Sequence, residues 1–120
     1  MKVQVWVSYN YGAYSLKFVK DFDLPFAPFY NMVLDTSDNF TDENDIRLVN
    51  NDYCDTNIIW YATDEFFEVD VRNIWKHPVT DSTIDDIIKK FFATKWDRKD
   101  TEDIAKLKQL MKKEHGFLYL

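Results

Sequence analysis

Glycine is scarce in this sequence, which contains only Gly12 and Gly116 among its 120 residues. Loops that cradle phosphates, such as the P-loop and the dinucleotide-binding fingerprint, need several glycines within a few positions. The sequence therefore excludes both motifs, and a phosphate, if bound at all, would be held in another way.

Cysteine and histidine are equally scarce, with one cysteine, Cys54, and two histidines, His77 and His115. A single cysteine forms no internal disulfide, which favours a reducing compartment, and we expect a cytoplasmic protein. Neither histidine has a second His or Cys at ligand spacing, so we expect no zinc site, no other metal and no cofactor. Any chain with one cysteine and two histidines could in principle form a Cys–His nucleophile pair, so their presence is no evidence for one at Cys54. We therefore predict no catalytic residue, and an enzyme is the least favoured of the function classes.

Long apolar runs are absent as well. No window is apolar enough to span a bilayer, and residues 1–10 alternate polar and apolar side chains where a signal peptide would be continuously apolar. We therefore expect no membrane association. At 14.4 kDa, residues 1–120 suit a single domain.

The net charge of −6 is concentrated in the middle of the chain. Residues 35–70 hold eleven acidic side chains against one arginine, whereas both flanks are slightly basic. Such a block disfavours contact with phosphates, and nucleic acid is not an expected partner, although residues 89–99 interleave bases with aromatic rings. The block either keeps an aromatic-rich protein soluble or attracts a basic partner.

Residues 57–75 give the clearest structural signal. Over residues 67–72 apolar and charged side chains alternate, which is typical of a strand with one buried face. Residues 58–62 are the expected partner strand, and the polar residues 63–65 are the expected turn. Residues 2–9 and 13–20 predict a second hairpin, with Gly12 at positive φ in its turn.

Two further short strands are predicted at 30–34 and 46–49. All local connections favour antiparallel pairing, so residues 2–75 should form a strongly curved sheet or small barrel of about five to six strands. Trp6 lies on the more polar face of its strand, so it is either covered by another layer or partly exposed, and we expect a covering helix. Residues 35–45 should be a loop. They do not match an EF-hand, which needs a glycine at its sixth position and a glutamate at its twelfth, where this sequence has Phe40 and Ile46. Only weak binding of a divalent cation is left as an expectation for this loop.

Two helices are expected after the sheet, at about 82–95 and 100–114, which makes the fold class α+β. The first has an apolar stripe at helical spacing and a capping box from Ser82 to Asp85. The second should stop at His115 and Gly116. The apolar residues 117–120 should return to the sheet as an edge strand, cover an edge of the core, or bind a partner.

The leading functional hypothesis is a non-enzymatic protein-interaction module, an adaptor or inhibitor, that uses an acidic or aromatic surface. A protein partner with a basic surface would then be expected. The candidate acidic surface consists of residues at and after the turn of the clearest hairpin: Asp64, Glu65, Glu68 and Asp70.

The alternative is a small-ligand binder, for a metabolite or nucleotide, with an aromatic-lined cleft. The residues proposed to line it are Phe26, Phe29, Trp60 and Tyr61. Packing into the core is the simpler explanation for these rings. With four tryptophans and an apolar C-terminus, the chain is also expected to be able to form a homodimer.

Overall fold

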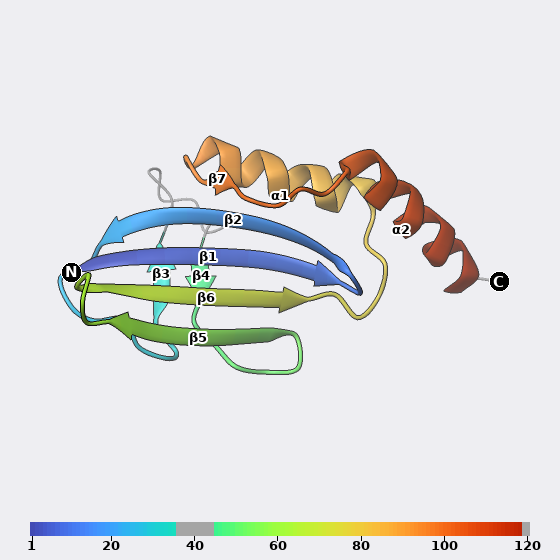
Figure 1. The fold of residues 1–120 in the computed structure, drawn as a ribbon. Helices are drawn as coiled ribbons and strands as arrows, with labels where there is room; N and C mark the ends of the chain where they lie inside the picture. Colours follow the sequence, from blue (N-terminus) through green and yellow to red (C-terminus); the bar gives the residue numbers. More distant parts are fainter. Residues whose placement is uncertain (36–44, 119–120) are drawn as a thin grey trace.

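A computed structural model of the chain describes residues 1–35 and 45–118 (Figure 1). It confirms the α+β fold class. Seven strands and two helices follow in the order β1 (Lys2–Tyr11), β2 (Tyr14–Asp23), β3 (Val33–Asp35), β4 (Asp45–Arg47), β5 (Cys54–Tyr61), β6 (Phe66–Ile74), α1 (Asp81–Ala93), β7 (Asp97–Arg98) and α2 (Ile104–Leu118).

Both predicted hairpins are present. β1 pairs with β2 through the tight turn at Gly12, whose φ of 56° is the positive value expected there. β5 pairs with β6 as predicted, and the observed register places Ile58 opposite Val69. Glu65 closes the second turn at a φ of 54°, a conformation that a non-glycine residue adopts at some cost.

The main sheet has the order β5-β6-β1-β2-β7 and is mixed, because β1 and β6 run parallel. The prediction of antiparallel pairing throughout was therefore wrong at this position. Alternation of side chains has a period of two residues in both kinds of sheet, so it carries no information about strand direction.

The sheet is open. β5 and β7 lie at its two edges, and the predicted barrel is not formed. The two short predicted strands are present as β3 and β4, but they pair only with each other, and Figure 1 shows them crossing behind the main sheet. β7, which the sequence did not predict, adds two residues beside β2.

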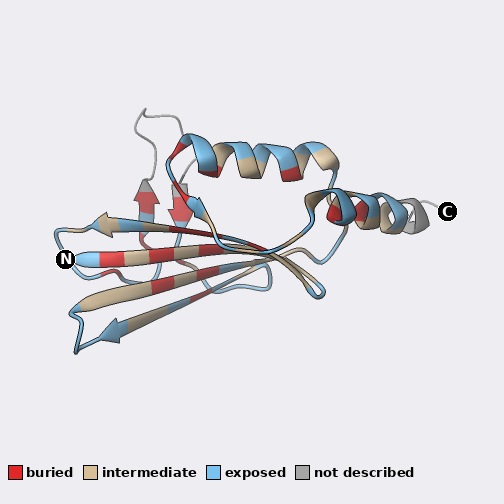
Figure 2. Ribbon diagram, turned by 45° about the horizontal axis from the view of Figure 1, so that its top comes forward, coloured by how far each residue is buried: buried red, intermediate tan, exposed pale blue. Residues whose placement is uncertain are grey.

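One face of the sheet carries the core. Buried side chains line β1, β2 and β6 and the sides of the helices turned toward them, as the red segments in Figure 2 show. Phe91 of α1 stacks on Phe18 of β2 with ring centroids 4.2 Å apart and planes 7° from parallel. Trp96 packs edge-on against Phe91 and seals this layer. The helix stripe predicted from the sequence is therefore what α1 buries.

Within residues 1–35 and 45–118, no helix covers the other face of the sheet, so the prediction of a helix over Trp6 was wrong. Both helices pack on the face that carries Val3, Val5 and Val7. Trp6 is partly exposed, and its indole N–H donates to Oε1 of Gln4 at 2.9 Å. The uncovered layer is called the open face below.

Helix α1 begins two residues earlier than its predicted cap implied. The N-cap is Thr80, whose hydroxyl accepts the backbone N–H of Thr83 at 3.3 Å. Ser82 lies inside the first turn instead of at the cap. The predicted capping box was therefore displaced by two residues, because Thr80 has the same capping chemistry as Ser82.

Helix α2 begins at Ile104 and runs through Gly116 to Leu118, so both predicted ends were wrong. Residues 117–118 belong to this helix and not to an edge strand, and residues 119–120 lie outside the described part. Ion pairs from Lys108 to Asp85 (2.6 Å) and from Lys112 to Asp81 (2.9 Å) join α2 to α1. Within residues 1–35 and 45–118, neither helix is long and apolar enough to cross a membrane. The predicted loop at 35–45 falls almost wholly on residues 36–44, which are also outside the described part.

Candidate functional site

The end of the β5–β6 hairpin carries exposed aromatic rings on both of its faces. Trp60 contacts Phe67 on the core side, with ring centroids 4.7 Å apart. Tyr61 stacks on Phe66 on the open face, at 4.8 Å and 9°. Since neighbouring residues of a strand point to opposite faces, Trp60 and Tyr61 place a large ring on each side of the same edge. Both rings remain exposed, at 46% and 39%.

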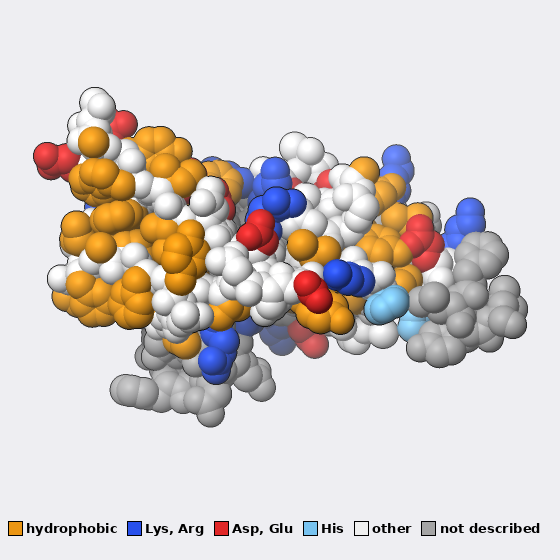
Figure 3. All heavy atoms as spheres, turned by 90° about the horizontal axis from the view of Figure 1, so that it is seen from below, with side chains coloured by type: hydrophobic (Ala, Val, Ile, Leu, Met, Phe, Trp, Pro, Cys, Tyr) orange, Lys and Arg blue, Asp and Glu red, His pale blue; other side chains and the backbone are white. Residues whose placement is uncertain are grey.

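Phe26 and Phe29 lie on the segment that connects β2 to β3. They are exposed, and their ring centroids are 5.9 Å apart. No ring contact joins them to Trp60 or Tyr61 within the described ranges. The four aromatic residues singled out in the sequence are therefore surface side chains, and Figure 3, which looks from the β5 side, shows hydrophobic side chains gathered at one end of the molecule (left).

The predicted acidic residues lie along the same hairpin. Asp64 and Glu65 are exposed in its turn. Glu68 and Asp70 follow on the open face of β6, where the Tyr61 hydroxyl donates to Glu68 at 3.4 Å. The structure thus places Glu68 and Asp70 on the same face as Tyr61, and Asp64 and Glu65 in the turn that follows it.

The carboxyl group of Asp70 on β6 has an altered pKa. Burial, followed by the charge of Glu68 and a hydrogen bond with it, raises the pKa of Asp70 to about 6, and Arg72 only partly offsets this. The charge of Glu68 also raises the pKa of the Tyr61 hydroxyl. Like charges held two residues apart on one face of a strand produce this effect.

The first half of the β5 edge is covered by the loop that precedes it. The N–H of Cys54 donates to Oδ1 of Asn51 at 2.9 Å, and the N–H of Thr56 donates to Oδ1 of Asn50 at 2.8 Å. The N–H of Asn51 in turn donates to the carbonyl of Cys54. Two asparagine side chains and the Asn51 N–H therefore bind three of the backbone groups that point away from β6.

The second half of the β5 edge has no such cover. Because backbone groups alternate along an antiparallel edge, those of Ile58 and Trp60 point outward like those of Cys54 and Thr56. In the part of the chain that the structure describes, no hydrogen bond from outside the sheet reaches either residue. Nothing in the residue pattern of the sequence distinguished these two positions, because their exposure depends on where the preceding loop lies.

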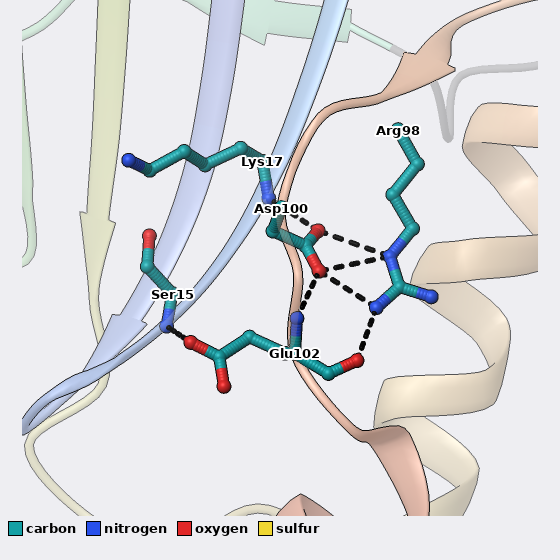
Figure 4. Close-up of polar contacts among 5 residues, drawn as sticks. All are labelled: Ser15, Lys17, Arg98, Asp100 and Glu102. Carbon is teal, nitrogen blue, oxygen red and sulfur yellow. Dashed lines mark hydrogen bonds and ion pairs between the residues drawn. The ribbon is translucent and has the colours of Figure 1, made fainter.

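The opposite edge of the sheet is closed by side chains, as Figure 4 shows. Asp100 accepts the backbone N–H of Lys17 at 2.9 Å, and Glu102 accepts that of Ser15 at 3.1 Å. Arg98 holds Asp100 in place with bonds of 2.6 to 3.0 Å from its guanidinium. Side chains from the segment after β7 thus cover the β2 edge at Ser15 and Lys17, whereas the outward backbone groups of Ile58 and Trp60 on β5 have no such partner among the described residues.

Nucleophilic chemistry at Cys54 finds no support in its surroundings. Burial, with a further contribution from Asp55, raises the pKa of the Cys54 thiol although a hydrogen bond with Thr56 opposes this, so the thiol form predominates at neutral pH. Tyr9, which faces Cys54 across β6, has its pKa raised to about 12 by burial. Among the described residues, no group of three or more His, Cys, Asp or Glu side chains is placed to hold a metal ion.

Comparison with protein-family models, curated proteins and solved structures finds no match for this chain.

Proposed function

We propose that this protein is a cytoplasmic protein-interaction module, an adaptor or inhibitor, that binds an extended segment of a basic partner along the second half of β5. The observation that carries this proposal is the uncovered backbone of Ile58 and Trp60, which lies between exposed aromatic rings. An added strand would pair with these backbone groups, as in known cases of β-strand addition.

The difference between the two sheet edges supports this proposal. Soluble proteins protect exposed edges, since unpaired strands associate with other chains. Here β2 is covered at Ser15 and Lys17 by Glu102 and Asp100, and the start of β5 is covered by Asn50 and Asn51. The uncovered second half of β5 is also the place where Trp60 and Tyr61 supply apolar area that a partner could bury.

The charge around this edge defines the partner. Asp64 and Glu65 lie at the tip, and Glu68 and Asp70 lie on the open face close by. A strand that carries Lys or Arg at alternate positions would place its charges near these acids. The association should therefore be faster and tighter at low salt.

Titration with short synthetic peptides tests the proposal directly. A peptide of alternating Val and Lys should shift the backbone amide resonances of Ile58 and Trp60 in a saturable manner, whereas an alternating Val and Glu peptide should not. Ile58→Pro removes an N–H that has no partner inside the fold and should weaken binding by about tenfold or more, because one intermolecular hydrogen bond and the strand geometry are lost. Ile58→Val keeps the N–H and is the matched control. Equal binding of both peptides, or unchanged affinity in Ile58→Pro, would contradict the proposal.

A homodimer through the same edge is a related proposal. Two copies of β5 could pair antiparallel about a two-fold axis and bury Trp60 of each copy. Sedimentation of the wild-type chain over a wide concentration range should then show a dimer that Ile58→Pro converts to monomer. A wild-type chain that stays monomeric at the highest concentration would rule this arrangement out.

The second candidate function is binding of a metabolite or nucleotide at Phe26, Phe29, Trp60 and Tyr61. Its support is the exposure of all four rings, of which Phe26 and Phe29, with ring centroids 5.9 Å apart, could stack together on a planar ligand, whereas Trp60 and Tyr61 lie on opposite faces of β5. A thermal-shift screen separates the two functions: stabilisation by a small planar molecule that is lost in Phe29→Ala would favour the ligand, and the absence of any stabilisation would count against it.

A further inference from the structure

A cavity of about 430 Å³ lies on the open face of the sheet, over β6, β1 and β2. The aligned strands place three polar side chains in one row across its floor: Arg72 is opposite Ser8, and Ser8 is opposite Lys17. Adjacent strands are about 4.8 Å apart, so the two cations flank the hydroxyl at a distance that their long side chains can close. All three residues line the cavity.

The hydroxyl at the centre of this row has an unused hydrogen. Oγ of Ser8 accepts from Nδ2 of Asn10 at 2.9 Å, and Asn10 is itself held by Ser15, whose hydroxyl donates to its Oδ1 at 2.8 Å. Within residues 1–35 and 45–118, the Ser8 hydroxyl donates to no acceptor. A fixed oxygen with a free O–H is a donor available to a ligand.

Neither flanking cation is neutralised by a strong ion pair. Arg72 approaches Asp55 only to 4.0 Å, and both side chains are more than half exposed. Lys17 has no ion pair in the described ranges, and Figure 4 shows its side chain extending from β2 toward β1. An exposed pair at 4.0 Å contributes little, so both cations can bind an anion.

The next row of side chains in the cavity is acidic and apolar instead of basic. Asp70 lies opposite Trp6, two residues along β6 from Arg72, and it also lines the cavity. The indole N–H of Trp6 is already bonded to Gln4, so Trp6 offers its ring and not its donor. The floor therefore presents two cations and a hydroxyl in one row and a carboxylate with an apolar wall in the next.

We propose that this cavity binds a small organic oxyanion that carries an amino group. Its phosphate or carboxylate oxygens would contact Arg72, Lys17 and the Ser8 hydroxyl, and its ammonium would contact Asp70. The short alkyl chain between the two groups would lie against the Trp6 ring. Phosphate and carboxylate share this recognition chemistry, since both accept several charge-assisted hydrogen bonds. The site shares Asp70 with the proposed interaction surface but does not include the β5 edge, so loss of anion binding in Arg72→Gln or Lys17→Gln tests it separately from that function.

The experiment follows backbone amide resonances of the whole chain during titration with four probes: O-phosphoethanolamine, β-alanine, inorganic phosphate and ethanolamine. We expect saturable shifts at Ser8, Asn10 and Ser15 with one or both of the amino-bearing anions, and the one that binds more tightly identifies the oxyanion. Inorganic phosphate and ethanolamine should each bind at least about tenfold more weakly, because each fills only one row.

Variants assign the contacts. Arg72→Gln and Lys17→Gln should each weaken binding by about tenfold, and Ser8→Ala should weaken it less because no charge is removed. Lys106→Gln, an exposed lysine on α2, is the matched control and should have no effect. Unsaturable shifts, an equal loss in Lys106→Gln, or equally tight binding of phosphate alone would overturn the proposal. Because all of these side chains are at least partly exposed, amide spectra without probe should confirm that each variant is folded.

Discussion

The carboxylate of Asp100 accepts the backbone N–H of Lys17 at 2.9 Å, so a side chain from the segment between the two helices completes the edge of β2. Asp100 is 3% exposed, and it also accepts from Arg98 and from the backbone N–H of Glu102. This one residue therefore joins β2 to the start of α2.

Asp100→Asn should lower the free energy of unfolding by about 2 kcal/mol at neutral pH, because an amide keeps the shape but loses the charge-assisted bonds. Urea unfolding followed by circular dichroism measures the change. Asp97→Asn, at an exposed carboxylate of β7, is the control and should change stability by less than about 0.5 kcal/mol.

The same variant has a defined pH dependence. Burial alone would raise the pKa of Asp100, but the hydrogen bonds from Arg98, Lys17 and Glu102 outweigh it and hold the pKa below its usual range. The stabilisation is thus present above the carboxyl pKa of the unfolded chain, roughly 4, and is lost as the pH falls through the folded pKa. The difference between wild type and Asp100→Asn should shrink in acid, and a constant difference would contradict this account.

Asp70 should behave in the opposite way. Its pKa is raised to about 6 in the fold, so its contribution to stability is present below about pH 4 and is lost as the pH rises through 6. Asp70→Asn should therefore be more stable than wild type at pH 8 and equal to it near pH 4. Because Asp70 is only partly buried, solvent screening limits the gain to about 1 kcal/mol or less.

Urea unfolding at the two pH values tests this prediction, and Asp64→Asn in the exposed turn is the matched control. A gain for Asp64→Asn as large as that for Asp70→Asn would show that general charge reduction, and not the contact with Glu68, is responsible.

Two neighbouring phenylalanines on α1 should differ sharply. Phe91 is 2% exposed and stacks on Phe18, whereas Phe92 is 56% exposed. Phe91→Ala should cost about 3 to 5 kcal/mol through lost burial and the cavity left behind, and Phe92→Ala should cost less than about 1 kcal/mol. Thermal and urea unfolding of both variants check the expected order. Similar losses in the two would mean that α1 does not pack through this face.

The N-terminus of α1 offers a further paired test. Thr80→Ala removes the hydroxyl that accepts the Thr83 N–H and should lower stability by about 1 kcal/mol. Ser82→Ala, at the residue favoured as cap from the sequence, should have an effect near zero or slightly stabilising, because alanine is the better helix former. A larger loss for Ser82→Ala than for Thr80→Ala would place the cap at Ser82 after all.

Local patterns predicted most of the individual elements. The alternation around Val69 and the tight turn at Gly12 specify hairpins whose partners are close in sequence, and the stripe that includes Ile84 and Phe91 specifies the buried side of α1. The aromatic and acidic residues at the end of the β5–β6 hairpin were also found from the sequence, because their positions near one turn determine which of them lie together.

The sequence by itself determined that this chain forms two hairpins and two helices, because those depend on side-chain periodicity and turn chemistry over short distances. Only the tertiary structure decided that β6 lies parallel to β1, since periodicity is the same for either direction. That pairing leaves β5 at an edge with Ile58 and Trp60 uncovered, and it brings Arg72, Ser8 and Lys17 into one row. Both proposed binding surfaces therefore arise from contacts between segments far apart in the chain, which local patterns do not encode.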